Sequence, residues 1–183
     1  WNVISAIPGH KEPDRVILFG NHRDAWVNGA VDPNSGTTIL LEIARIFGKM
    51  YKEGWKPART IMFASWDGEE YGLLGSTEWV EDRIASLNKT LMAYINIDQG
   101  VYGKFFKASA TPSLQTLIYN VTKGITDPFS PDKTVYDTWF NNSGAIIKEL
   151  GLGSDYVPFV HQIGVASMDV RFEGPYGVYH SNY

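Results

Sequence analysis

The sequence has no cysteine among its 183 residues. Disulfides and thiolate metal ligands are therefore absent, and the redox compartment cannot be inferred from cysteine usage. The chain also lacks any run of Lys and Arg, and its formal net charge is −4. Both features argue against nucleic acid and against an anionic membrane surface as partners. No apolar run approaches the roughly 20 residues of a membrane-spanning helix, so we expect no membrane segment in this chain.

Hydrophobic residues make up 44% of the chain and aromatic residues 14%. This composition predicts one sizeable core, and thus a single globular domain or most of one. The chain opens with Trp1 inside a strand-like run and without a signal peptide, as a piece of a longer protein would. Sequons begin at Asn88, Asn120 and Asn141. They favour a secreted, lumenal or extracellular location, with membrane anchoring through an N-terminal segment outside this chain as a further expectation.

Apolar runs and helical periodicities alternate along the chain. Predicted strands cover residues 1–7, 14–20, 59–66, 91–97 and 165–172, and predicted helices cover 37–51, the segment after Glu70 to about 87, 113–123 and 155–162. This alternation predicts an α/β fold with a mixed, largely parallel central sheet flanked by helices. Turn formers between the first two strands predict a hairpin, Asn34 or Ser35 is the expected N-cap of the first helix, and residues 130–143 are interpreted as a loop.

Two adjacent acids, Glu69 and Glu70, follow the apolar strand 59–66. They lie at a strand's carboxyl end, where open α/β sheets place their ligand sites. The alternative is that they merely begin a helix, because acids there complement the helix dipole. Asp67 is interpreted only as such a helix-start acid.

Other polar residues stand at or near strand ends and could converge on the same edge; with Glu70 they are His22, Asp32, Asp98 and His180. A pair of divalent cations about 3.5 to 4 Å apart needs one bridging carboxylate plus a nitrogen and an oxygen ligand for each ion. Two imidazoles and three carboxylates meet that need, and this donor set suits zinc. Taken singly, each residue also has an ordinary explanation as a turn acid or a surface histidine. His10 and His161 are assigned no role.

Five motifs follow one another in order: His22–Asp24, Asp32–Gly36, Glu69–Ser76, Asn96–Asp98 and Tyr179–Ser181. Together they resemble the catalytic domain of the co-catalytic zinc exopeptidases, in particular the glutamate carboxypeptidase II branch. The resemblance covers nearly the whole chain, including Glu53–Trp55 and Phe63–Trp66. It implies that residues 1–183 are part of an aminopeptidase-like catalytic domain, truncated at its C-terminal end. It also implies that a protease-associated domain and a helical domain, through which the protein forms a homodimer, lie outside this chain.

The resemblance also implies roles for the site residues. One zinc would take His22 and Asp98, the other Glu70 and His180, with Asp32 bridging the two ions. Glu69 matches the general base that activates a metal-bridging hydroxide for hydrolysis of peptide bonds in small peptides. A carboxylate next in sequence to a ligand can reach the attacking water without coordinating the metal.

Further positions carry weaker expectations. Tyr179 matches the tyrosine that donates a hydrogen bond to the oxyanion of the tetrahedral intermediate. Asp24 is a candidate partner for His22, with an ordinary turn acid as the alternative. Glu78 and Glu81 match two ligands of a structural calcium, although such a pair also suits a solvated helix face.

Specificity is where the sequence departs from its relatives. Acid-preferring members carry two arginines around the strand that here contains Asp169 and Arg171, and Asp169 replaces one of them. A carboxylate at that place would repel an acidic residue on the amino side of the scissile bond. We therefore expect a broader dipeptidase or aminopeptidase, in preference to a carboxypeptidase for acidic dipeptides.

Two other classes remain open. The transferrin receptor type keeps the fold, has lost metal ligands and serves as a binding module, whereas all five ligand positions and Glu69 are present here. A zinc amidohydrolase acting on non-peptide amides would share the ligands. The sequence thus favours a metallo-exopeptidase over a receptor-like module.

Overall fold

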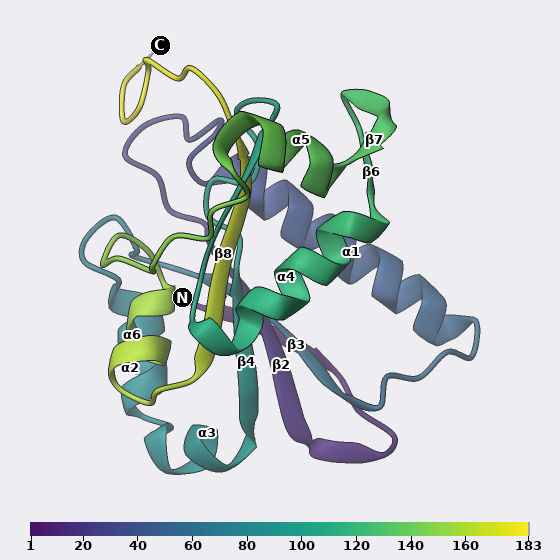
Figure 1. The fold of residues 1–183 in the computed structure, drawn as a ribbon. Helices are drawn as coiled ribbons and strands as arrows, with labels where there is room; N and C mark the ends of the chain where they lie inside the picture. Colours follow the sequence, from purple (N-terminus) through teal and green to yellow (C-terminus); the bar gives the residue numbers. More distant parts are fainter. Residues whose placement is uncertain (183) are drawn as a thin grey trace.

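The computed structural model describes residues 1–182, which are built around one six-stranded sheet (Figure 1). Its strand order is β1-β3-β2-β4-β8-β5. The strands are β1 (Val3–Ile7), β2 (Glu12–His22), β3 (Arg59–Trp66), β4 (Leu91–Asn96), β5 (Phe105–Ala110) and β8 (Ala166–Glu173). The four central strands run parallel, and β1 and β5 are antiparallel edge strands. The predicted α/β class with a mixed, largely parallel sheet is confirmed.

Helices cover both faces of the sheet (Figure 1). They are α1 (Asn34–Lys52), α2 (Leu74–Glu81), α3 (Ile84–Thr90), α4 (Pro112–Gly124), α5 (Val135–Ser143) and α6 (Tyr156–His161), and a short ribbon of β6 (Thr126–Asp127) and β7 (Ser130–Thr134) precedes α5. One core packs α2, α3 and α6 against Leu18 and Tyr94. On the other face, α4 and α5 pack against Met168 and Ile95. Side chains of neighbouring strand residues point to opposite faces, so the buried middle of a central strand such as β3 is mostly apolar on both.

The predicted hairpin of the first two strands is wrong. β1 pairs with β3, and β3 lies between β1 and β2 in the sheet. The intervening turn crosses the start of β3, where Gly9 N–H donates to Thr60 Oγ1 and His10 N–H donates to the Pro57 carbonyl. Turn residues locate a reversal of the chain, but they do not determine which strand pairs with which.

Three helix assignments also need correction. Residues 130–143 form β7 and α5 in place of a loop, and a capping box between Thr134 and Asp137 begins the helix. The helix predicted to reach about residue 87 is two helices, α2 and α3. Pro33, not Asn34 or Ser35, is the N-cap of α1, which has no side-chain cap, and Ser35 Oγ donates to the Val31 carbonyl.

The carboxyl ends of the parallel strands lie at one edge of the sheet. β2 ends at His22 and β4 at Asn96, and α1 begins beside both ends. A Cβ on Gly36 of α1 would lie only 2.0 Å from the Asp98 carbonyl oxygen. Glycine therefore lets the helix approach closely and brings the Asp32 loop against the end of β4. Within residues 1–182, no helix is long and apolar enough to cross a membrane.

Candidate metal centre

His22 is the last residue of β2, and its side chain is 1% exposed. Its Nδ1 lies 2.9 Å from the backbone oxygen of Asp24, so Nδ1–H can donate there and leave the lone pair of Nε2 free. Nε2 lies 3.0 Å from Asp98 Oδ1 and 3.1 Å from Asp32 Oδ1. The ring thus presents a potential metal-ligating nitrogen to two carboxylates.

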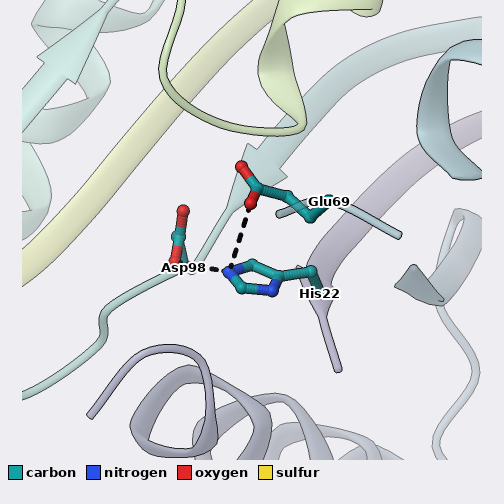
Figure 2. A group of neighbouring side chains, drawn as sticks. All are labelled: His22, Glu69 and Asp98. Carbon is teal, nitrogen blue, oxygen red and sulfur yellow. Dashed lines mark hydrogen bonds and ion pairs between the residues drawn. The ribbon is translucent and has the colours of Figure 1, made fainter. Parts of the chain in front are cut away.

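Glu69 completes the first cluster with His22 and Asp98, whose potential ligand atoms lie within 4.8 Å of one another. Figure 2 shows the Glu69 and Asp98 carboxylates both directed at one ring nitrogen of His22. Glu69 Oε2 is the more distant partner, 3.9 Å from Nε2. Burial raises the pKa of Glu69 to about 8, so this side chain binds a proton more strongly than an exposed glutamate does.

Asp32, Glu70 and His180 make a second cluster of the same kind. His180 Nε2 lies 3.0 Å from Asp32 Oδ2 and 3.3 Å from Glu70 Oε2. His180 reaches this position with a left-handed backbone, φ 53°, which is a conformation that residues other than glycine seldom adopt. The Glu70 and Asp32 side chains are buried, whereas His180 is partly exposed.

Asp32 belongs to both clusters through its two oxygens. Oδ1 faces His22 and Oδ2 faces His180. Gln99 Nε2 also donates to Oδ2, at 3.0 Å. One carboxylate therefore lies between two imidazoles, as a ligand shared by two cations would.

The residues fit a pair of divalent cations. Among the residues described, the buried oxygen Glu70 Oε1 has no hydrogen-bond partner, and Asp32 Oδ1 faces His22 Nε2 at 3.1 Å, so both oxygens are placed to ligate a cation. Burial lowers the pKa of His22, but hydrogen bonds to Asp32 and Asp98 outweigh it and raise the pKa to about 12. The negative potential that retains a proton on this ring would equally attract a metal ion. Nitrogen and carboxylate donors without thiolate are compatible with zinc.

Asp24 contacts His22 and both glutamates at once. Its backbone oxygen orients His22, while its carboxylate oxygens accept hydrogen bonds from the backbone N–H groups of Glu69 at 3.0 Å and Glu70 at 3.1 Å. The carboxylate lies 3.7 Å from His22 Nδ1, farther than the backbone oxygen. The two glutamates precede α2, which begins at Leu74, so the helix-start interpretation does not account for them.

Comparison with known proteins identifies the family. The model of peptidase family M28 matches residues 2–183. The chain belongs to peptidase family M28. The chain is 50% identical over 184 residues to an Arabidopsis thaliana protein named "Probable glutamate carboxypeptidase LAMP1". The alignment covers 100% of this chain and 27% of that protein. It is 45% identical over 182 residues to the mouse protein named Aminopeptidase NAALADL1, covering 93% of this chain and 24% of that protein.

The fold of this M28 chain also occurs in solved structures. A structure described as a zinc aminopeptidase from Bacillus subtilis superposes with a TM-score of 0.72 at 20% identity, covering 98% of this chain and 43% of that one. The resemblance to glutamate carboxypeptidase II-like exopeptidases is confirmed. M28 membership implies zinc, and the two clusters are the candidate positions for the metal. The chain spans about a quarter of the length of its curated relatives.

Three further predicted residues lie beside the two clusters. Tyr179, Asp169 and Arg171 line a cavity of about 250 Å³ together with Glu69 and Asp98. The Tyr179 ring stacks on His180 with centroids 3.7 Å apart. Burial, followed by the nearby carboxylates, raises the pKa of Tyr179 to about 12.

The predicted calcium pair lies elsewhere. Glu78 and Glu81 are exposed on α2, and Glu81 Oε1 accepts a hydrogen bond from Gln162. Neither belongs to a three-residue metal-type cluster within the described part of the chain, and calcium stays a prediction. His10, which was assigned no role, lies with Nδ1 2.8 Å from the Pro57 carbonyl oxygen.

Sequence reasoning missed two contacts of the metal centre. Gln99 donates to Asp32, and Ser154 Oγ donates to Asp98 Oδ2 at 2.6 Å. Gln99 directly follows the Asn96–Asp98 motif and could have been found there. Ser154 is far from Asp98 in sequence, and only the parallel pairing of β4 with β8 brings its loop to the site.

Proposed function

We propose that this chain is the catalytic part of a di-zinc exopeptidase that hydrolyses small peptides. The observation that carries the proposal is the placement of Asp32, whose two oxygens face His22 and His180 separately. A buried carboxylate between two imidazoles, each with a further acid beside it, is the arrangement that two neighbouring cations require. An isolated structural ion pair would need only one of those histidines.

The proposed ligands divide between the two ions. His22 and Asp98 would hold one zinc, Glu70 and His180 the other, and Asp32 would bridge them. When bound, zinc polarises the scissile carbonyl group and makes water a strong nucleophile near neutral pH. The buried surroundings of both clusters support this role, because charges act more strongly where water is excluded.

Glu69 is the proposed general base. Its buried carboxylate borders the cavity and stays beyond hydrogen-bond distance of His22 Nε2. It can therefore accept a proton from the attacking water and deliver it to the leaving amine. Tyr179 keeps its phenolic proton near neutral pH, since its pKa is raised to about 12. Its O–H group can then donate to the developing oxyanion.

Two carboxylates next to Arg171 support a preference for neutral peptides. Arg171 NH2 lies 4.0 Å from Asp169 Oδ2, and its Nε lies 3.8 Å from Glu173 Oε2. These acids offset the positive charge that would otherwise attract an acidic substrate residue. We propose a dipeptidase or aminopeptidase of broad specificity on this basis.

Metal analysis and a substrate panel test the proposal on the full-length protein. We expect two zinc ions per chain and faster hydrolysis of neutral than of acidic dipeptides. Absence of zinc would favour a receptor-like module of the same fold. Hydrolysis of non-peptide amides, with peptides left intact, would favour an amidohydrolase. Efficient cleavage of acidic dipeptides in preference to neutral ones would overturn the specificity proposal alone.

The cellular setting is a separate proposal. Asn88, Asn120 and Asn141 begin sequons and are exposed on α3, α4 and α5. Exposed acceptors support N-glycosylation, and with it a secreted, lumenal or extracellular location. We also propose a homodimer formed through a helical domain outside these residues. A mass decrease on treatment with an N-glycosidase, and the mass of the native assembly, test the two statements.

A further inference from the structure

A chain of buried hydrogen bonds begins far from the solvent. Trp66 Nε1–H donates to the Tyr94 hydroxyl at 3.0 Å, and that hydroxyl donates to Asn96 Oδ1 at 2.8 Å. All three side chains are fully buried. The order of donors determines the orientation of the Asn96 amide, since Oδ1 must face Tyr94 and Nδ2 must face the opposite way.

The amide nitrogen of Asn96 then serves two acceptors. Nδ2 donates to Ser154 Oγ and to Asp169 Oδ1, both at 2.9 Å. Ser154 continues the series of hydrogen bonds, because its hydroxyl donates to Asp98 Oδ2 at 2.6 Å. Both N–H groups of the amide therefore donate. One donates to the Asp169 carboxylate, and the other donates to Ser154, which itself donates to the Asp98 carboxylate.

Asp169 holds the other side of the same amide. Its carboxylate, 6% exposed, accepts the second hydrogen bond of Asn96 Nδ2 and so fixes the amide in the orientation that directs its first one at Ser154. Asn96 therefore reaches the Asp98 side chain through Ser154. With Oδ2 of Asp98 engaged by Ser154, Oδ1 is the oxygen directed at His22 Nε2.

The neighbouring strand leaves room for this chain of side chains. A Cβ added to Gly20 would lie 2.2 Å from the Tyr94 hydroxyl oxygen and 2.7 Å from Trp66 Nε1. Gly20 precedes His22 by two residues on β2. The hydrogen-bonded chain thus crosses the strand that carries the histidine ligand and ends at the carboxylate that faces it.

We propose that Asn96 and Ser154 are positioning residues that set the orientation of the Asp98 carboxylate for metal binding. The inference rests on the proposed di-zinc function. Partners of a ligating carboxylate typically change metal affinity or activity by about 10- to 100-fold when removed. A buried network that served folding alone would change stability and leave metal affinity unaltered.

The test measures zinc affinity directly. Zinc-free full-length protein is titrated with Zn²⁺ in competition with a chromophoric chelator, for wild type, Ser154→Ala and Asn96→Asp. Ser154→Ala removes the donor to Asp98, and Asn96→Asp replaces the donating amide with an acceptor. Ser167→Ala is the matched control, because Ser167 is also a buried serine, on β8, but its hydroxyl donates to the Val165 carbonyl.

We expect Ser154→Ala and Asn96→Asp each to weaken one of the two zinc affinities by about 10-fold or more, with the other within about threefold of wild type. Ser167→Ala should leave both affinities unchanged, and Ser154→Thr, which keeps the hydroxyl, should bind more tightly than Ser154→Ala. Wild-type zinc affinities in folded Ser154→Ala would overturn the positioning role, and that variant decides if Asn96→Asp does not fold. A wild-type protein that binds no zinc would overturn the proposed function together with this inference.

Discussion

The carboxylate of Asp24 accepts a hydrogen bond from the backbone N–H of Glu69 at 3.0 Å. This contact joins the end of β2 to the turn that follows β3. Glu69 belongs to that turn, so its position depends on a carboxylate that would not itself contact a substrate or a metal. A hydrogen bond to a charged acceptor is worth about 1.5–3 kcal/mol, enough to stabilise one conformation of a short turn.

Replacing Asp24 should therefore impair catalysis more than metal binding by the His22 cluster. In Asp24→Ala, the backbone oxygen that orients His22 remains, while the two N–H groups of the glutamate turn lose their acceptor. We expect kcat to fall by about 10-fold or more, since small displacements of a catalytic group are costly. Steady-state kinetics and zinc content measure the effect. Asp14→Ala, an exposed change on β2, is the control, and equal kcat values in both variants would contradict the prediction.

The two adjacent glutamates should respond differently to the same substitution. Glu69→Gln removes a proton acceptor and should lower kcat by about 10²- to 10⁴-fold with zinc retained. Glu70→Gln removes a proposed ligand and should weaken one zinc affinity. Activity assays paired with metal analysis distinguish the two outcomes. Loss of zinc in Glu69→Gln, or wild-type activity in that variant, would contradict the assignment.

Asp32 and His180 provide a test of the bridging arrangement. Asp32→Ala should weaken both zinc affinities, because each oxygen faces a different imidazole. His180→Ala should weaken only one. Titration of the zinc-free protein shows the number of sites affected. His161→Ala, an exposed histidine at the end of α6, should change neither affinity. If Asp32→Ala affected one site only, the shared ligand would be ruled out.

Asp155 should make stability depend on pH. The residue is fully buried, Ser76 Oγ donates to its Oδ1 at 2.5 Å, and burial raises its pKa to about 7. An unfolded aspartate has a pKa of about 3.9, so the folded state binds the proton more tightly and this group's contribution to stability falls as pH rises from about 5 to about 8. The loss is on the order of 2 kcal/mol.

Melting temperatures of the full-length protein at both pH values test this expectation. Asp155→Asn cannot ionise, so its melting temperature relative to wild type should rise between about pH 5 and about pH 8. Asp82→Asn, an exposed substitution just after α2, should show no such trend. A wild-type minus variant difference that is the same at both pH values would refute the role of Asp155.

Local patterns were sufficient for the α/β class and for the zinc-ligand candidates. The end of an apolar strand is visible in the sequence as a change to polar residues. Parallel strands bring their carboxyl ends together, so His22 and Asp98 could be expected to lie close to each other. The pairing of β1 with β3 could not be predicted, because strand order depends on long-range packing. The capping box at Thr134 was available in the sequence, but the aromatic residues after it have no clear helical period.

The hydrogen-bonded surroundings of the ligands were less accessible to prediction. Asn96 was part of a recognised motif, yet its bonds to Ser154 and Asp169 depend on β4 lying beside β8. Asp24 looked like a partner for His22, and its side chain instead holds the glutamate turn. Such contacts arise from the register between distant segments, and a single sequence carries no direct record of that register.

The order of the ligands along the chain has a consequence for biosynthesis. His22, Asp32, Glu69 and Asp98 all lie in the first part of the chain, whereas His180 stands near its end. Translation proceeds at about 5–20 residues per second, so the ribosome releases every member of the first cluster several seconds before it releases His180. All residues of the His22 cluster are thus available before the histidine of the Asp32 cluster, so any metal loading during synthesis would begin at the His22 cluster.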